Sequence, residues 1–144
     1  MTSADNDPNW FIEIKDLEKY IPAAKGLQKT CDILSFSHGI YREGDHAEHN
    51  HLSVVKYLDA WTPYLYQICN QGIVMEQITM NINNEAVNTI YTLHNAKLST
   101  LRPGGSRGSY EQPVEELAFS YESITVSYAD EQYKGSATIN NVHS

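Results

Sequence analysis

The chain has 144 residues, which suits a single domain spanning residues 1–144 with a hydrophobic core of its own. Its formal net charge of −8 argues against a nucleic-acid groove, where lysine and arginine must neutralise phosphates, and against attachment to anionic membranes. No apolar run approaches the roughly 20 residues needed to cross a bilayer, so no membrane insertion is expected.

The first eight residues are polar and acidic, and we expect them to form a flexible N-terminus. They contain neither a basic region nor an apolar core, so they do not resemble a signal peptide. We therefore expect a protein that is cytoplasmic when made and that, if secreted, leaves the cell without a cleavable signal peptide.

The first half of the chain alternates apolar and polar residues at the period of a β-strand. This pattern predicts strands over residues 10–15, 28–41 and 52–58. Residues 20–26 contain Pro22 and are predicted to form a loop. Residues 42–50 are polar and charged, and they are also predicted to form a loop.

One short α-helix is predicted at about Pro63–Gln71. The Thr62 hydroxyl can cap its start by accepting an orphan amide, and Pro63 suits the first turn, where a missing N–H costs nothing. Gly72 can end the helix because glycine enters the left-handed conformation without strain. An apolar stripe on this helix comprises Leu65, Ile68 and Cys69.

After the helix the chain again reads as strands, over residues 74–83, 89–101, 114–129 and 133–139. Asn83-Asn84 is predicted as a tight turn, because asparagine tolerates a left-handed backbone. The phase of alternation slips at Glu122-Ser123, which indicates a bulge or a bend. The pattern as a whole predicts a mainly β fold, a barrel of about seven to eight antiparallel strands with one short helix.

Two features could suggest chemistry. Asp45, His46, Glu48, His49 and His51 offer metal-binding side chains, but a polar loop gives ligands neither rigid positions nor a second shell. The glycine-rich segment Arg102–Gly108 lacks the Lys-Ser/Thr and the following helix of a phosphate loop. We expect no metal and no cofactor.

Nucleophilic catalysis is equally unsupported, and we expect no enzyme and no catalytic residues. No serine lies in a Gly-x-Ser-x-Gly elbow. Glu115 and Glu116 should point to opposite faces of a strand, where they cannot act together. Cys31 and Cys69 are expected to be buried free thiols, with a single disulfide as the alternative.

Four segments in order resemble the haemolysin-coregulated protein (Hcp) family, the tube subunit of bacterial type VI secretion systems. They cover nearly the whole chain: the strand Ile33–Ile40, the strand and helix start Leu52–Leu65, the segment Leu98–Gly108, and the closing strand Glu115–Tyr128 with its phase slip.

The resemblance implies a β-barrel subunit that forms a homo-hexameric ring. Rings would stack into a hollow tube that a contractile sheath drives. The end of the tube would meet a spike protein, and its lumen would carry effector proteins. It transfers no catalytic residue. Three contact regions are implied: the loop with Tyr41, Arg42, Glu43, Asp45, His46, Glu48 and His49; the helix face with Thr62, Pro63, Tyr64, Tyr66 and Gln67; and the glycine-rich loop with Arg102, Gly104, Gly105 and Arg107.

Two departures from the family pattern are visible. His38 stands where the family often has tryptophan, and the loop at residues 41–50 is shorter and richer in histidine and acid. Because histidine changes its charge near neutrality, these residues suggest that acidification alters ring association. The alternatives to a tube subunit are a monomeric β-barrel module that binds a ligand or peptide, and a metal enzyme built on the histidine loop.

Overall fold

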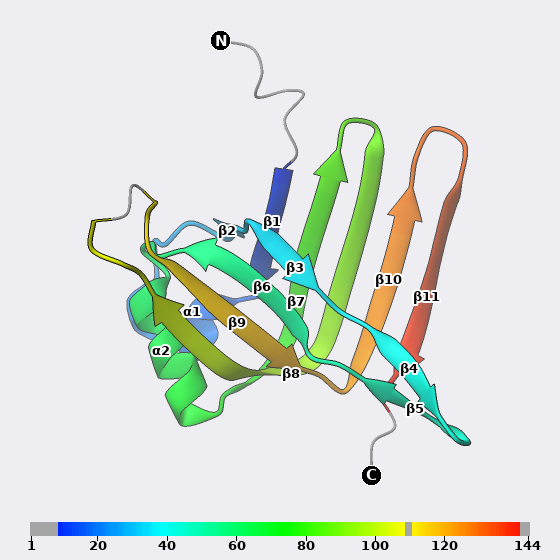
Figure 1. Ribbon diagram of the computed structural model, residues 1–144, viewed down its shortest axis with the longest axis horizontal. Coiled ribbons are helices and arrows are strands. Elements are labelled where there is room, and N and C mark those ends of the chain that lie inside the picture. Colours follow the sequence, from blue (N-terminus) through cyan, green and yellow to red (C-terminus); the bar gives the residue numbers. More distant parts are fainter. Residues whose placement is uncertain (1–8, 109–110, 142–144) are drawn as a thin grey trace.

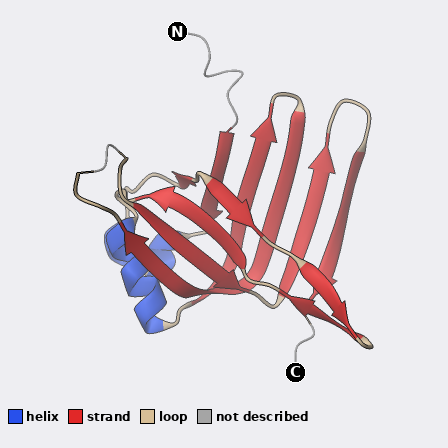
Figure 2. Ribbon diagram, in the orientation of Figure 1, coloured by secondary structure: helices blue, strands red, loops and turns tan. Residues whose placement is uncertain are grey.

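A computed structural model describes residues 9–108 and 111–141 (Figure 1). The described residues form an antiparallel β-structure with helices gathered at one end (Figure 2). In chain order the elements are β1 (Asn9–Ile14), α1 (Leu17–Tyr20), the 3-10 helix η2 (Pro22–Ala24), β2 (Thr30–Asp32), β3 (Ser35–Ser37), β4 (Ile40–Glu43), β5 (His46–His49), β6 (Leu52–Tyr57), α2 (Thr62–Gln71), β7 (Val74–Asn84), β8 (Val87–Gly104), β9 (Val114–Ser120), β10 (Ser123–Ala129) and β11 (Lys134–Asn140).

The main sheet has nine strands, of which seven follow the order β2-β1-β7-β8-β9-β6-β3. The 18-residue strand β8 pairs with β7 along one edge, and along its other edge the first half pairs with β10 and the second half with β9. Asn95 lies between these halves with φ of 51°, and Glu122 donates its amide to the His94 carbonyl at 3.0 Å. Strands β3, β6 and β9 therefore cross the view of Figure 1 at an angle to β7, β10 and β11.

This bend lies where the sequence phase slips. The slip was predicted to be a bulge or bend within one strand, and the chain in fact ends β9 at Ser120 and begins β10 at Ser123. A register shift in the opposing strand falls between Leu98 and Thr100. Two strands thus replace the single strand predicted over residues 114–129, and the predicted last strand is confirmed as β11.

The prediction of a closed barrel is wrong for the described residues, whose ladders leave the sheet open between β2 and β3. Only Ile33 and Leu34 lie between these two strands, and their backbone amides bond to opposite edges of the sheet. The amide of Ile33 bonds to Trp10 in β1, whereas the amide of Leu34 bonds to Val55 in β6. The chain therefore passes from one sheet edge to the other without a ladder between them.

Helix α2 packs against β8, and its stripe is confirmed, since Leu65 and Ile68 are buried and Cys69 is half-buried. Gly72 ends the helix at φ of 62°, as predicted. The predicted Thr62 cap is wrong, because the Thr62 hydroxyl accepts the amide of Asp59 at 3.0 Å instead of a helical amide. Leu65 and Ile68 join a single core with Ile21, which lies between α1 and η2, and with buried strand residues that include Ile12, Leu52, Val54, Met75, Ile78, Met80, Leu93, Leu117, Phe119 and Ile124.

Three predicted irregular segments differ from the structure. Residues 42–50, predicted as a loop, belong to a separate two-stranded sheet, the β4–β5 hairpin, which turns at Gly44 with φ of 64°. Its β4 residues are all exposed, so the alternation that marks a half-buried strand is missing. Asn83 and Asn84 belong to β7, and the turn is one step later at Glu85, with φ of 50°. The predicted loop at residues 20–26 contains η2 and the end of α1.

Candidate functional site

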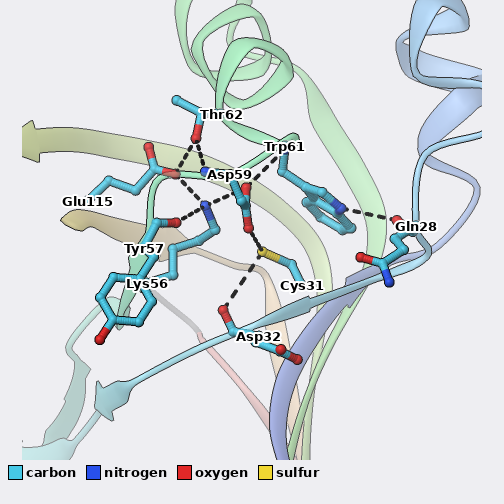
Figure 3. A network of polar contacts seen from close by, with 9 residues as sticks. All are labelled: Gln28, Cys31, Asp32, Lys56, Tyr57, Asp59, Trp61, Thr62 and Glu115. Carbon is cyan, nitrogen blue, oxygen red and sulfur yellow. Dashed lines mark hydrogen bonds and ion pairs between the residues drawn. The ribbon is translucent and has the colours of Figure 1, made fainter. Parts of the chain in front are cut away.

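A buried ion pair joins two neighbouring strands of the main sheet. Lys56 in β6 is paired with Glu115 in β9, and both residues have an exposed fraction of 0%. The Lys56 ammonium donates to Glu115 Oε2, to the Tyr57 carbonyl at 2.9 Å and to Asp59 Oδ1 at 2.9 Å (Figure 3). All three N–H groups of the ammonium are therefore satisfied, as a buried charge requires.

Further side chains extend this network to the start of α2 and to β2. The Thr62 hydroxyl donates to Glu115 Oε2 at 2.9 Å, and the Cys31 thiol contacts Asp59 Oδ2 at 3.3 Å. Asp59 Oδ1 also accepts the Trp61 amide at 2.9 Å. Figure 3 shows these groups converging between β2, β6, β9 and the helix. The network fixes the strand-to-helix junction at the sheet.

The surroundings of Lys56 and Cys31 keep the lysine charged and the thiol protonated. Burial alone would lower the pKa of Lys56, but the hydrogen bonds that its ammonium donates to Glu115 and Asp59 outweigh burial and raise that pKa. Burial also raises the pKa of the Cys31 thiol well above its ordinary value. The lysine stays charged and the thiol stays protonated, so neither is poised as a nucleophile or base. The network thus holds the strand-to-helix junction in place.

A local sequence signal marks both residues of this pair. Lys56 shares the strand phase of the buried residues Leu52 and Val54, and Glu115 shares the phase of Leu117 and Phe119. A charge at a buried strand position requires a partner of opposite sign. The prediction that Glu115 and Glu116 face opposite ways agrees with their burial, since Glu115 is buried and Glu116 exposed.

Cys31 is expected to resist thiol reagents in the folded protein. Both cysteines are free, with Cys31 buried and Cys69 half-buried. Because reaction requires an accessible thiolate, labelling of Cys31 should be at least about 100-fold slower in buffer than in denaturant. Timed alkylation followed by peptide mass spectrometry measures the two sites separately, and the Cys31→Ser variant checks the assignment. Equal Cys31 labelling rates in buffer and denaturant would contradict the burial seen here.

The residues predicted for the contact loop lie on the β4–β5 hairpin. Tyr41, Arg42 and Glu43 are exposed on β4, and Asp45 lies in the turn. At its tip, His46 Nε2 lies 2.9 Å from Glu48 Oε1, and His46 Nδ1 lies 3.4 Å from Asp45 Oδ1. The hairpin projects from the end of the molecule away from α2 (Figure 1).

His49 turns instead towards the main sheet, where its Nδ1 lies 2.7 Å from the Tyr121 hydroxyl. The described residues include no group of three or more His, Cys, Asp or Glu side chains arranged to hold a metal ion. The histidines of this segment are thus divided between the hairpin tip and its base.

The other two predicted contact regions lie at the opposite end from the hairpin. On α2, Pro63, Tyr66 and Gln67 are exposed and Tyr64 is half-buried, whereas Thr62 belongs to the buried network. In the glycine-rich segment, β8 continues through Arg102 to Gly104, so that the predicted loop begins as a strand. A set of four exposed residues remains on it: Arg102, Gly104, Gly105 and Arg107.

Comparison with known proteins identifies one family. A family model described as "Type VI secretion system effector, Hcp" matches residues 22–128. A search of curated protein sequences gave no significant match. No helix within residues 9–108 and 111–141 has the length and apolar character needed to cross a membrane.

Solved structures show the same fold at low sequence identity. Hcp1 from Salmonella typhimurium superposes with a TM-score of 0.76 at 17% identity, over 92% of this chain and 94% of that one. A type VI secretion system effector from Yersinia pestis gives 0.73 at 17% identity, over 92% and 99%. Hcp2 from Salmonella typhimurium gives 0.71 at 19% identity, over 92% and 94%.

Proposed function

The chain belongs to the Hcp family of type VI secretion systems, and from this premise we propose that it is a structural subunit that assembles into hexameric rings. Rings would stack into a hollow tube that a contractile sheath propels, with a spike protein at its end and effector proteins in its lumen. The protein would be exported by this route. We assign it no catalytic role.

The family match over residues 22–128 carries this proposal. The exposed sheet edge supports it, because all seven residues of β11 are exposed. An exposed strand edge invites pairing with another chain, and a ring of identical subunits covers such edges with one repeated contact. The hairpin supports it too, since Ile40 and Tyr41 are 41% and 51% exposed there. Exposed apolar groups of this kind suit an interface.

The proposal is tested by the mass and shape of the purified protein. We expect native mass spectrometry to give six times the 16.3 kDa subunit mass, and negative-stain electron microscopy to show rings with a central hole. Lone subunits at all concentrations up to about 1 mM, well above usual complex affinities, would contradict the proposal and favour a monomeric binding module.

A further inference from the structure

Two histidines share one tyrosine hydroxyl at the base of the β4–β5 hairpin. His38 Nε2 and His49 Nδ1 each lie 2.7 Å from the Tyr121 hydroxyl oxygen. The imidazole rings of His38 and His49 also lie against the Tyr121 ring, with centroid distances of 5.8 Å and 5.6 Å. Tyr121 itself is 6% exposed. This geometry defines a compact cluster of three side chains, which we call the His–Tyr–His cluster.

The cluster connects the hairpin to the main sheet. His49 belongs to β5, and His38 precedes β4 in the segment that leads into the hairpin. Tyr121 lies in the main sheet between β9 and β10. The two chain segments at the hairpin base are joined by the Asn50 amide and the Gly39 carbonyl at 2.9 Å. Tyr121 therefore bonds a histidine from each of these two segments to the main sheet.

The number of protons in the cluster determines which group donates in each bond and how much positive charge faces the hydroxyl. A tyrosine hydroxyl has one proton to donate and lone pairs to accept. With both imidazoles neutral, one donates its N–H to the oxygen and the other accepts the hydroxyl proton. Protonating the accepting imidazole leaves the hydroxyl proton without its acceptor. Protonating the second places two cations on one oxygen.

The surroundings offer these charges little compensation. The cavity beside the cluster has a lining of Ser37, His38, His49, Asn50, His51, Ser53 and Ala118, with no carboxylate among them. From β8, the neutral Tyr91 ring packs on His38 at 6.2 Å.

The carboxylates next in sequence to the cluster have other partners. Glu48 precedes His49 in β5, and its carboxylate contacts His46. Glu122 follows Tyr121, and its carboxylate lies 3.4 Å from the side-chain amide nitrogen of Asn95. His51, on the chain leaving β5, is a third histidine in the lining of this cavity.

Burial, and secondarily His49, lower the pKa of His38 below its ordinary value of 6.5. The unfolded chain therefore takes up this proton before the folded one does. The contribution of His38 to stability is complete above about pH 6.5 and decreases as the pH falls below that value.

We propose that protonation of His38 and His49 detaches the β4–β5 hairpin from Tyr121, so that the hairpin is held on the main sheet at neutral pH and released in acid. This device acts within one subunit and does not require ring formation. It differs from a titration of the exposed tip, because the histidines concerned face the sheet.

Hydrogen–deuterium exchange of the intact protein tests the proposal. We compare peptides covering residues 38–51 at pH 7.5 and 5.5, each normalised to β7 and β8 amides in the same sample. The relative protection of the hairpin should fall about fivefold to tenfold at pH 5.5, as expected for the loss of a hydrogen bond and the gain of like charge. Native mass spectra of the same samples show whether the fall accompanies a change in assembly.

Three variants make the test specific. His38→Gln with His49→Asn retains polar atoms near the positions of Nε2 and Nδ1 but cannot titrate, so its hairpin protection should not depend on pH. Tyr121→Phe should show low hairpin protection at both pH values. His46→Gln, at the exposed tip, should behave as the original protein.

Equal relative protection at pH 7.5 and 5.5 in the original protein would overturn the proposal. So would a fall that persists in the His38→Gln/His49→Asn variant, or one that His46→Gln abolishes. A fall in hairpin protection while the mass of the assembly stays constant supports the inference. That result does not depend on the proposed ring. Loss of rings without a change in hairpin protection would leave the proposed function standing and reject this inference.

Discussion

Lys56→Met is expected to destabilise the protein by about 3–5 kcal/mol, the usual cost of breaking a buried ion pair by removing one partner. The substitution leaves the Glu115 carboxylate buried with the Thr62 hydroxyl as its remaining donor. Glu115 Oε1 already has no hydrogen-bond partner among the described residues, so the lost ammonium has no nearby replacement. Urea unfolding at a fixed protein concentration, followed by circular dichroism, measures the effect.

Two control variants distinguish the ion pair from a general loss of lysine. Lys97→Met, at an exposed position in β8, should change the free energy of unfolding by less than about 0.5 kcal/mol. Lys56→Met combined with Glu115→Leu removes both charges and should be more stable than Lys56→Met alone. If the double variant is the less stable of the two, the uncompensated carboxylate is not the cause.

Replacing both Ile40 and Tyr41 with serine is expected to abolish ring formation at micromolar concentration. This prediction rests on the proposed function, in which the hairpin contacts a neighbouring subunit. Both side chains are large, apolar and exposed in the isolated subunit. Truncating a central aromatic of an interface costs about 2 kcal/mol or more, and a ring repeats that loss at each contact. Native mass spectrometry should show subunits in place of hexamers.

The matched control is Tyr41→Phe, which keeps the ring and the apolar area and should still assemble. The double variant should retain the unfolding transition of the isolated subunit, because neither side chain belongs to the buried core. Rings of normal abundance in the double variant would exclude these residues from the contact, although other surfaces could still form the assembly.

The elements that the sequence predicted best are those that bury one face. Residues of β7 alternate between the core and the surface, and α2 has an apolar stripe followed by Gly72, so both were predicted closely. Burial imposes these periods on the sequence, and a period can be read without knowing the partner. Within the β4–β5 hairpin no residue is fully buried, and residues 42–50 were predicted as a loop for that reason.

The candidate sites were predicted unevenly. The exposed hairpin residues could be named from the resemblance, but the role of His49 differs from that of His46 because only the former contacts Tyr121. Tyr121 lies 72 residues from His49, and no local pattern relates them. Lys56 and Glu115 are separated by 59 residues, although each occupies a buried strand phase that called for a partner.

By itself the sequence determined the class of fold, the helix, the break near Glu122 and the family, because these depend on short-range periodicity and on ordered local motifs. Tertiary structure alone decided which strands pair, that no ladder joins β2 to β3, and which polar groups meet in the interior. The physical reason is that hydrogen bonds and ion pairs act over a few ångströms in space. Only the folded chain sets those distances between residues far apart in sequence.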